Sequence, residues 1–595
     1  MLSQILVDVA MGRKPADLVI RNGQWVCVQT GEFIPATDIA ISLGRIAFIG
    51  ENAAHTIGMD TQVIEAEGRF LVPGLLDAHM HVESGMVTLT EFVRAVAPHG
   101  TTGMFIDPHE IANIFGLKGV KLMVDEATLQ PVHVWVQMPS CVPSAPGLET
   151  PGVSIEPADV AEAMGWPGII GLGEMMNSPG VFMTDDKMHS EMRTTRDAGK
   201  VIGGHYASLD LGLPFHGYAA GGPEDNHEGT RLEDAIARAR QGMKVMVRYG
   251  SAWHDVAEQI KAVTIHGLDA RHFLLCTDDS HAATLAFEGH MDRTVRHAID
   301  EGVPPMQVIQ MATLNTAIHF GVSRDVGMLA PGRFADVLIV DDLDHFKART
   351  VIAQGEVIGS EGQLCIPLAH HYIPAWATRS VHLPKKLSAQ DFILKTPVPN
   401  GGMVSVNVIG IIENQAPTRH LKLLMPVVAG EIRSSLSAEH PSDVAKIAVI
   451  DRHQGTGKVQ IALVSGFDFT EKCAIASTVA HDCHHLLVVG TDEDCMALAA
   501  NRLAEIGGGQ VVIRDGEIIG EVQLPIAGLM SDERVDIVAR KVASVLNGFR
   551  ACGCTIKNPN MQLSLLALVV IPELRVSDKG LVDVVRQKII PLIED

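Results

Sequence analysis

Between residues 71 and 328, short apolar runs alternate with amphipathic helical patterns, and this rhythm limits the possible folds more than any other feature of the sequence. The eight runs are centred near Leu75, Met104, Val134, Ile170, Val201, Asp225, Val245 and Leu275. Eight strand–helix steps in about 250 residues match a (β/α)₈ barrel, although a doubly wound open sheet shows the same alternation. Polar residues stand at the C-terminal ends of the runs, where such barrels keep their chemistry, so we predict the barrel.

Several of these polar residues are of types that bind metal ions. The segment GLLDAHMHVESG places His79 and His81 two residues apart, so both imidazoles point to the same side of a strand. Later runs end in Glu174, His205, His227 and Asp278. Taken singly, each is most simply a polar residue at a strand end. As an ordered set on five strand ends, these imidazoles and carboxylates predict a metal site.

Patterns rich in β-strands flank the predicted barrel. Residues 1–70 and 329–382 show near-alternating strands broken by Gly and Asn turns. We predict that they form one small composite β domain, although two unrelated β segments would look the same. Residues 383–402 are rich in Pro and Lys and are interpreted as a linker, and residues 403–595 show the strands and helices of a separate α+β domain.

Composition narrows the classes of partner and compartment. The sequence has 47 Lys and Arg against 70 Asp and Glu, a net charge of −23, which disfavours nucleic-acid polymers and anionic membranes as partners. The net charge is compatible with small neutral or cationic substrates. Nine scattered cysteines fit a reducing compartment. We see no signal-peptide pattern and no uncharged run near the roughly 20 residues of a membrane helix, so we expect a cytoplasmic protein.

Beyond single residues, several long motifs resemble the amidohydrolase superfamily, and within it the bacterial adenine deaminase family. The similarity covers nearly the whole chain and is carried by VPGLLDAHMHVESGM, DPHEIANIFG, GLGEMMNSPGV, GMKVMVRYGSA and CAIASTVAHDCHHLLVVG. It implies a TIM-like metallo-hydrolase barrel with a small composite β domain and a C-terminal α+β domain.

The resemblance also implies a ligand set for two divalent metal ions. His79, His81 and Asp278 would hold one ion, His205 and His227 the other, and Glu174 would bridge them. Relatives such as hydantoinases and dihydroorotases carry a carboxylated Lys at the bridging position, and Glu174 argues against those branches. A mixed nitrogen and oxygen site suits Mn²⁺ or Fe²⁺, which we place before Zn²⁺.

The implied reaction is hydrolytic deamination of adenine to hypoxanthine and ammonia, a step of purine salvage. Asp278, Glu110 and Glu174 are the expected catalytic residues. The expected substrate-binding residues are His109, Glu110, Asn113 and Arg248, although a loop-capping network around Asp107 would explain the first three equally well. The alternatives are another aminopurine or cyclic amide as substrate, and a catalytically silent scaffold. We expect a purine as small-molecule partner and a homo-oligomer, dimeric or higher.

Three local features qualify the resemblance. Tyr249 follows Arg248 where similar proteins have Glu, which could alter substrate preference or rate. We expect Glu228 to alternate away from His227 and to support it rather than act directly. The segment AHDCHH departs at Cys483 and His485 from the AHDSHN of similar members. It either reaches over the barrel mouth or is structural, and we favour the structural interpretation.

Overall fold

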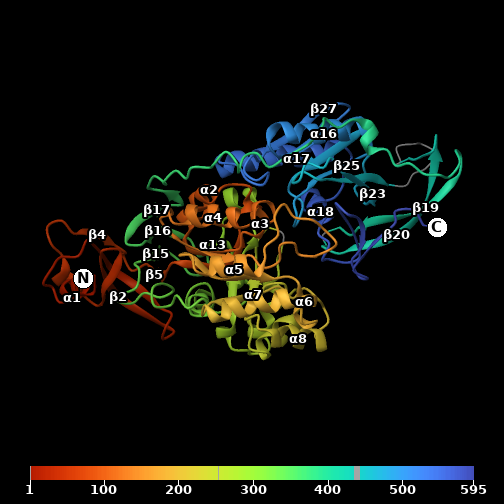
Figure 1. The fold of residues 1–595 in the computed structure, drawn as a ribbon. Helices are drawn as coiled ribbons and strands as arrows, with labels where there is room; N and C mark the ends of the chain where they lie inside the picture. Colours follow the sequence, from red (N-terminus) through yellow and green to blue (C-terminus); the bar gives the residue numbers. More distant parts are fainter. Residues whose placement is uncertain (1, 252, 414, 434–442, 595) are drawn as a thin grey trace.

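The computed structural model describes residues 2–251, 253–413, 415–433 and 443–594. A small β-rich part at the N-terminal end, a central α/β part and a C-terminal α+β part succeed one another along the molecule (Figure 1). Among the described helices, none is long and apolar enough to cross a membrane.

The small β-rich part is one nine-stranded sheet built from both flanks of the barrel. Its strands run in the order β18-β17-β16-β15-β5-β1-β2-β3, with β4 paired to β1. They are β1 (Leu18–Cys27), β2 (Glu32–Ser42), β3 (Arg45–Gly50), β4 (Gln62–Glu65), β5 (Phe70–Pro73), β15 (Val337–Val340), β16 (Ala348–Ala353), β17 (Glu356–Ser360) and β18 (Gln363–Leu364), and α1 (Leu2–Ala10) packs beside them. The antiparallel pairing of β5 with β15 joins the two flanks.

The central part is the predicted barrel, and the predicted fold class is confirmed. Its parallel strands coincide with the eight apolar runs: β6 (Leu75–His81), β7 (Thr101–Ile106), β8 (His133–Met138), β9 (Ile169–Met175), β10 (Val201–Gly204), β11 (Asp225–Asn226), β12 (Lys244–Arg248) and β13 (Phe273–Cys276). β14 (Asp278–Asp279) continues β13 and pairs in parallel with β6. Between β10 and β11, the Glu224 amide donates to the carbonyl of Ile202 at 2.8 Å.

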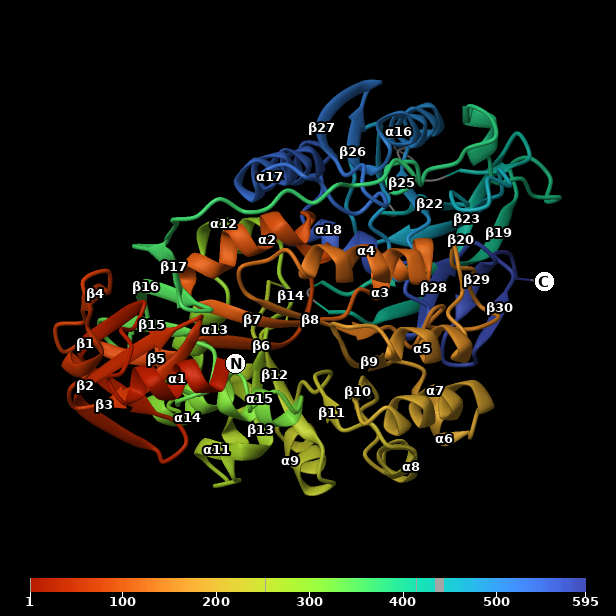
Figure 2. The same ribbon diagram turned by 60° about the vertical axis from the view of Figure 1, so that its left-hand side comes forward.

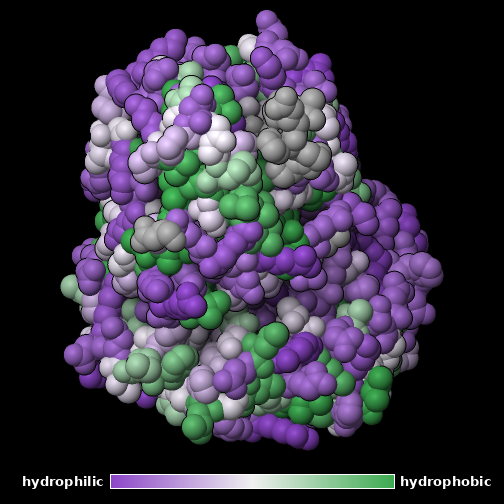
Figure 3. Space-filling view, turned by 90° about the vertical axis from the view of Figure 1, so that its right-hand side faces the viewer, coloured by the Kyte–Doolittle hydropathy of each residue, from purple (hydrophilic) through white to green (hydrophobic). Residues whose placement is uncertain are grey.

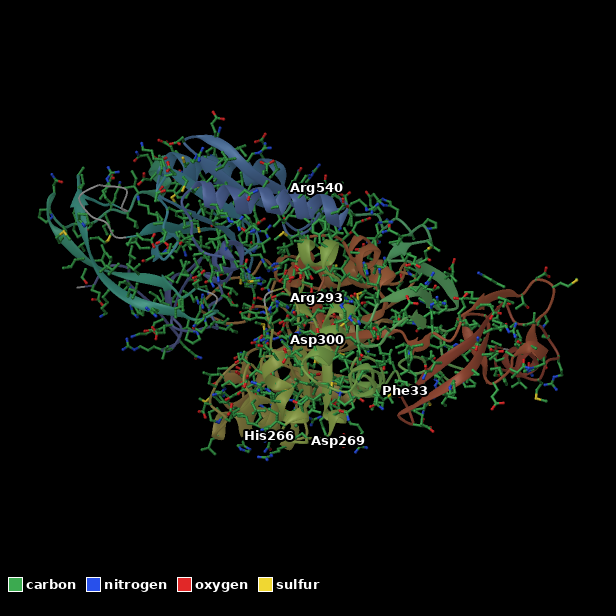
Figure 4. All side chains as sticks on the ribbon, turned by 180° about the vertical axis from the view of Figure 1, so that it is seen from behind. Phe33, His266, Asp269, Arg293, Asp300 and Arg540 are labelled. Atoms are coloured by element: carbon green, nitrogen blue, oxygen red, sulfur yellow. The ribbon has the colours of Figure 1, made fainter. Side chains whose placement is uncertain are left out.

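Helices surround the strands on the outside (Figure 2). They are α2 (Leu89–Val96), α3 (His109–Phe115), α4 (Leu117–Ala127), α5 (Pro157–Met164), α6 (Ser178–Phe182), α7 (Asp186–Asp197), α8 (Leu213–Gly221), α9 (Leu232–Arg240), α10 (Val256–Gln259), α11 (Lys261–Thr264), α12 (Ala282–Phe287), α13 (Met291–Asp300), α14 (Pro305–Met311) and α15 (Leu314–His319). Viewed from behind, Arg293 of α13 lies in the middle of the molecule, with His266 and Asp269 at the lower edge of the barrel (Figure 4).

A change of register in β6 turns its two histidines into the barrel. Leu76 and Ala78 belong to the apolar cluster that also contains Phe105 and the partly buried Trp135. Asp77 pairs with Met104 and Met80 pairs with Ile106, so β6 carries one residue more than β7 across this step. Such a bulge re-aims the side chains that follow it, and it explains how Ala78 and the next residue can both face inward.

The C-terminal part is built on a second nine-stranded sheet, ordered β21-β20-β19-β23-β22-β25-β24-β26-β27. The strands are β19 (Met403–Ile411), β20 (Thr418–Val428), β21 (Glu431–Ile432), β22 (Ala445–Ile450), β23 (Val459–Ser465), β24 (Cys473–Ser477), β25 (Leu486–Gly490), β26 (Gly509–Arg514) and β27 (Glu517–Gln523). Helices α16 (Glu493–Ile506), α17 (Val535–Ala551) and α18 (Pro559–Leu565) accompany it, followed by β28 (Leu574–Ser577), β29 (Gly580–Asp583) and β30 (Lys588–Ile590).

Local sequence explains the limits of α16. The side chain of Asp492 accepts a hydrogen bond from the Cys495 amide at the helix start, and Gly507 ends the helix with φ of 85°, a conformation that glycine adopts without a Cβ clash. The segment interpreted as a linker packs against this helix: Leu387 exchanges backbone hydrogen bonds with the Asn501 side chain, and Phe392 is fully buried.

We predict that Phe105→Ala destabilises the barrel by about 3–5 kcal/mol, the usual cost of removing a buried phenyl ring. Phe105 is fully buried and stacks on Phe320 and Trp135, with ring centroids 3.8 and 4.7 Å away. Chemical denaturation followed by circular dichroism measures the change. Phe287→Ala is the matched control, because Phe287 is 68% exposed and its truncation should cost less than about 0.5 kcal/mol. Equal effects of the two variants would contradict this packing.

Candidate metal centre

The six predicted metal ligands meet at the C-terminal ends of the barrel strands. The Nε2 atoms of His79 and His81 are 3.2 Å apart, and His81 Nε2 lies 3.2 Å from an Asp278 carboxylate oxygen. The rings of His79 and His227 stack with centroids 3.9 Å apart. The groups with converging donor atoms include His79 with His81 and Glu174, His79 with His227 and Asp278, and Glu174 with His205 and His227.

Glu174 lies at the centre of this arrangement. Its Oε1 is 3.5 Å from His81 Nε2, and its Oε2 is 3.1 Å from His227 Nε2 and in close contact with His205 Nδ1. Although burial opposes it, the neighbouring imidazoles hold the pKa of Glu174 well below its usual range. One ionised carboxylate therefore reaches histidines of both halves of the site, as a bridging ligand requires.

The histidine tautomers also fit a metal. His81 Nδ1 lies 2.8 Å from the carbonyl oxygen of Asp107, to which it donates, so Nε2 is the ring nitrogen that points toward Glu174 and Asp278. A ring nitrogen hydrogen-bonded to a backbone carbonyl orients a histidine for metal binding through its other nitrogen. Buried imidazoles and carboxylates whose lone pairs converge would repel one another without a cation. The donor set fits two divalent ions.

Asp278 is held in an unusual backbone conformation by a buried arginine. Its φ is 57°, a left-handed conformation that costs energy for a residue with a side chain and is concentrated at functional sites. Arg248, 1% exposed, donates to Asp278 at 2.9 Å, to Glu228 at 2.5 Å and to Asp255 at 2.8 Å. Arg248 therefore holds Oδ2 of Asp278, whereas His79 and His81 face Oδ1.

Glu228 differs from the expectation that it would face away from His227. β11 ends at Asn226, so strand alternation no longer applies. The Glu228 carboxylate lies 3.9 Å from His227 Nε2 and 4.0 Å from His205 Nε2. Burial acts against it, but the charge of Arg248 lowers the pKa of Glu228 to about 2, so this carboxylate adds negative charge beside the centre.

Tyr249, which replaces the usual Glu, lies outside the barrel. Its ring stacks on His297 of α13 at 3.9 Å, and the guanidinium of Arg293 lies 4.1 Å from its centroid. Neither contact involves a predicted ligand, so the substitution does not change the donor set.

The proposed substrate-binding residues that follow β7, the second barrel strand, lie at the start of α3. His109 Nδ1 is 3.2 Å from Glu174 Oε1, which places this imidazole against the centre. Glu110 is 1% exposed, and burial raises the pKa of its carboxyl group. Asn113 donates its amide to the backbone oxygen of His109 at 3.0 Å and so holds the first turn of the helix.

The C-terminal part contributes residues that we had expected to be structural. His481 Nδ1 lies 3.3 Å from Glu110 Oε1, and Asp482 Oδ1 lies 3.9 Å from His109 Nε2. The AHDCHH segment was the signal for them. The sequence could not show that it meets DPHEIANIFG, because the two stretches are more than 350 residues apart.

The barrel and its donor set define a metal-dependent hydrolase of the amidohydrolase class. The amidohydrolase family model matches residues 70–358, and the model of the adenine deaminase C-terminal domain matches residues 415–588. The adenine deaminase of Mesorhizobium japonicum is 60% identical over 97% of this chain and 95% of its own length. Adenine deaminase 3 of Rhizobium meliloti is 57% identical over 98% and 97%, and the Moorella thermoacetica adenine deaminase is 48% identical over 99% and 97%. The chain belongs to the adenine deaminase family.

We predict that Glu174→Ala loses both metal ions, because the carboxylate contacts histidines of both halves of the site. Elemental analysis of protein purified from manganese-supplemented cells measures the metal content per chain. Glu162→Ala, an exposed substitution on α5, is the matched control and should retain the wild-type content. Full metal occupancy in the Glu174 variant would exclude a bridging role.

Proposed function

We propose that this protein catalyses the hydrolysis of adenine to hypoxanthine and ammonia. The observation that carries the proposal is the convergence of six imidazole and carboxylate donors at the barrel mouth, in a chain 60% identical to an adenine deaminase over nearly its full length. Water adds at C6 of the purine, the exocyclic amine leaves as ammonia, and the C6 oxygen becomes the carbonyl of hypoxanthine.

The chemistry of the donors favours Mn²⁺ or Fe²⁺, with Zn²⁺ as a further candidate. His79, His81 and Asp278 would hold one ion, His205 and His227 the other, and Glu174 both. Such ions lower the pKa of water from about 15.7 toward about 7, which supplies a nucleophile at neutral pH.

The surrounding side chains handle protons and orient the substrate. Asp278 accepts the proton of the attacking water and returns this proton to the ring or to the leaving amine. Arg248 holds the Asp278 carboxylate in place. Glu110, with His109 and Asn113, provides the donors and acceptors that a purine edge requires. Glu228 accepts a hydrogen bond from Arg248, and its side chain is 20% exposed.

Purine salvage in the cytoplasm and a homo-oligomeric state complete the proposal. All nine cysteines are free, which agrees with a reducing compartment. Hydrophobic residues gather in patches between hydrophilic ones on the face shown in Figure 3. Leu424 and Val585 of the C-terminal part are 66% and 69% exposed, and these side chains are candidates for contacts between subunits. Light scattering of the purified protein tests the oligomeric state.

We predict that His79→Ala and Asp278→Asn each lower ammonia release from adenine by at least about 10³-fold, because each opens the metal site. Circular dichroism should stay unchanged, since apolar side chains below the rim fill the barrel. Global unfolding of both variants would show that these residues are structural.

A substrate panel separates the proposal from its alternatives. Manganese-loaded wild-type protein should release ammonia from adenine faster than from guanine or cyclic amides. Turnover of another compound without adenine turnover would identify a different amidohydrolase activity. A metal content well below one ion per chain would indicate a silent scaffold.

A further inference from the structure

The loop from Ala480 to His485 of the C-terminal part lies against the barrel mouth. It follows β24, and the His481 amide donates to the backbone oxygen of Ser564 in α18 at 3.1 Å. His481 contacts Glu110, and Asp482 is near His109, as described above. The His109 ring therefore lies between the metal donors and this loop. Its Nδ1 faces Glu174, and its Nε2 faces Asp482.

The C-terminal part itself holds the loop in shape. The buried guanidinium of Arg452 donates through Nε to the backbone oxygen of His484, and His453 Nε2 lies 2.6 Å from the oxygen of Cys483. The His484 amide donates to the oxygen of Ala480 at 2.8 Å. Side chains on such a fixed loop are preorganised for binding.

The tautomer of His484 is fixed by its own loop. The backbone amide of Ala480 donates to His484 Nδ1 at 3.1 Å, so the neutral ring carries its proton on Nε2. Burial strongly lowers the pKa of His484, which keeps the ring neutral. This excludes the ring as a metal ligand through Nε2 and makes that atom a hydrogen-bond donor. Among the described residues, Nε2 has no hydrogen-bond partner although it is buried.

Acceptors of the barrel lie beside the His484 ring. One ring nitrogen of His484, one of His481 and a carboxylate oxygen of Glu110 lie within 4.8 Å of one another. Neither carboxyl oxygen of Glu110 has a hydrogen-bond partner among the described residues. Leaving a buried donor or acceptor unsatisfied costs about 1–3 kcal/mol, so a donor and an acceptor left together indicate a bound group that pairs with both.

We propose that the C-terminal part forms a wall of the substrate site, in which His484 Nε2–H donates to N3 of the purine and Glu110 accepts from N9–H. The inference rests on the proposed function. When C6 of adenine is at the metal centre, the N3/N9 edge points away from the metal centre. The His109 ring, which lies between Glu174 and the loop, marks this direction. His481 is a positioning residue that orients the Glu110 carboxyl. A nucleoside has a sugar in place of N9–H, so this site selects the free base.

The test compares adenine with 3-deazaadenine, in which C–H replaces N3. The quantity measured is the ratio of kcat/KM for the two bases. Wild-type enzyme should favour adenine by about 5- to 100-fold, the loss expected when one buried donor is left unpaired. His484→Ala should lower kcat/KM for adenine by a similar factor and bring the ratio close to the intrinsic reactivity ratio of the two bases. His484→Gln, which keeps a donor near the Nε2 position, should restore part of the discrimination.

His485→Ala is the matched control from the same loop. His485 Nε2 lies 2.8 Å from the oxygen of Thr150, away from Glu110, so this variant should keep the wild-type ratio. An unchanged ratio in His484→Ala would overturn the assignment of N3. Full activity of wild-type enzyme on 9-methyladenine would overturn the assignment of N9–H to Glu110.

Product binding separates a failure of this inference from a failure of the proposed function. Calorimetry with hypoxanthine and 3-deazahypoxanthine gives the same N3 ratio without turnover. Absent ammonia release from adenine would count against the proposed function, whereas equal binding of the two products to wild-type and His484→Ala protein would count against the inference.

Discussion

The contact of one buried carboxylate with several imidazoles is the interaction on which the site depends. Glu174 lies within 3.5 Å of His81, His109 and His227 and in close contact with His205, and these histidines come from different strand ends. A buried carboxylate is stable only when it is paired. Its charge is balanced by these imidazoles, whose nitrogens together with the carboxylate form the candidate metal site.

Two features of the barrel place the ligands around that carboxylate. The bulge in β6 turns His79 and His81 inward after Leu76 and Ala78 have already pointed inward. At the other end of the barrel sequence, the left-handed conformation of Asp278 and its bond to Arg248 bring the last ligand to the same point. Both features are departures from regular strand geometry, and such departures are expected at functional sites.

The sequence predicted the barrel and its strands well because apolar runs of this length and spacing are compatible with few folds. The six donors were predictable for the same reason, since strand ends of a barrel meet on one face. Glu228 was misplaced because a two-residue strand does not carry alternation past its end. For the AHDCHH loop the sequence left two interpretations open, because local pattern holds no information on which surfaces two separate folding units bring together.

The position of that loop changes how the C-terminal part is understood. All six metal donors come from the barrel, so the C-terminal part is not required to supply a metal ligand. Its position at the mouth therefore indicates a different contribution. The backbone of Ser531 pairs with Met86 and Thr88 just after β6, and the Thr150 amide donates to the Asp578 carboxylate. Because these contacts fall on loops that follow barrel strands, docking of the domain and the shape of the mouth are set together. Substrate selection can then reside in the added domain while the metal chemistry resides in the barrel.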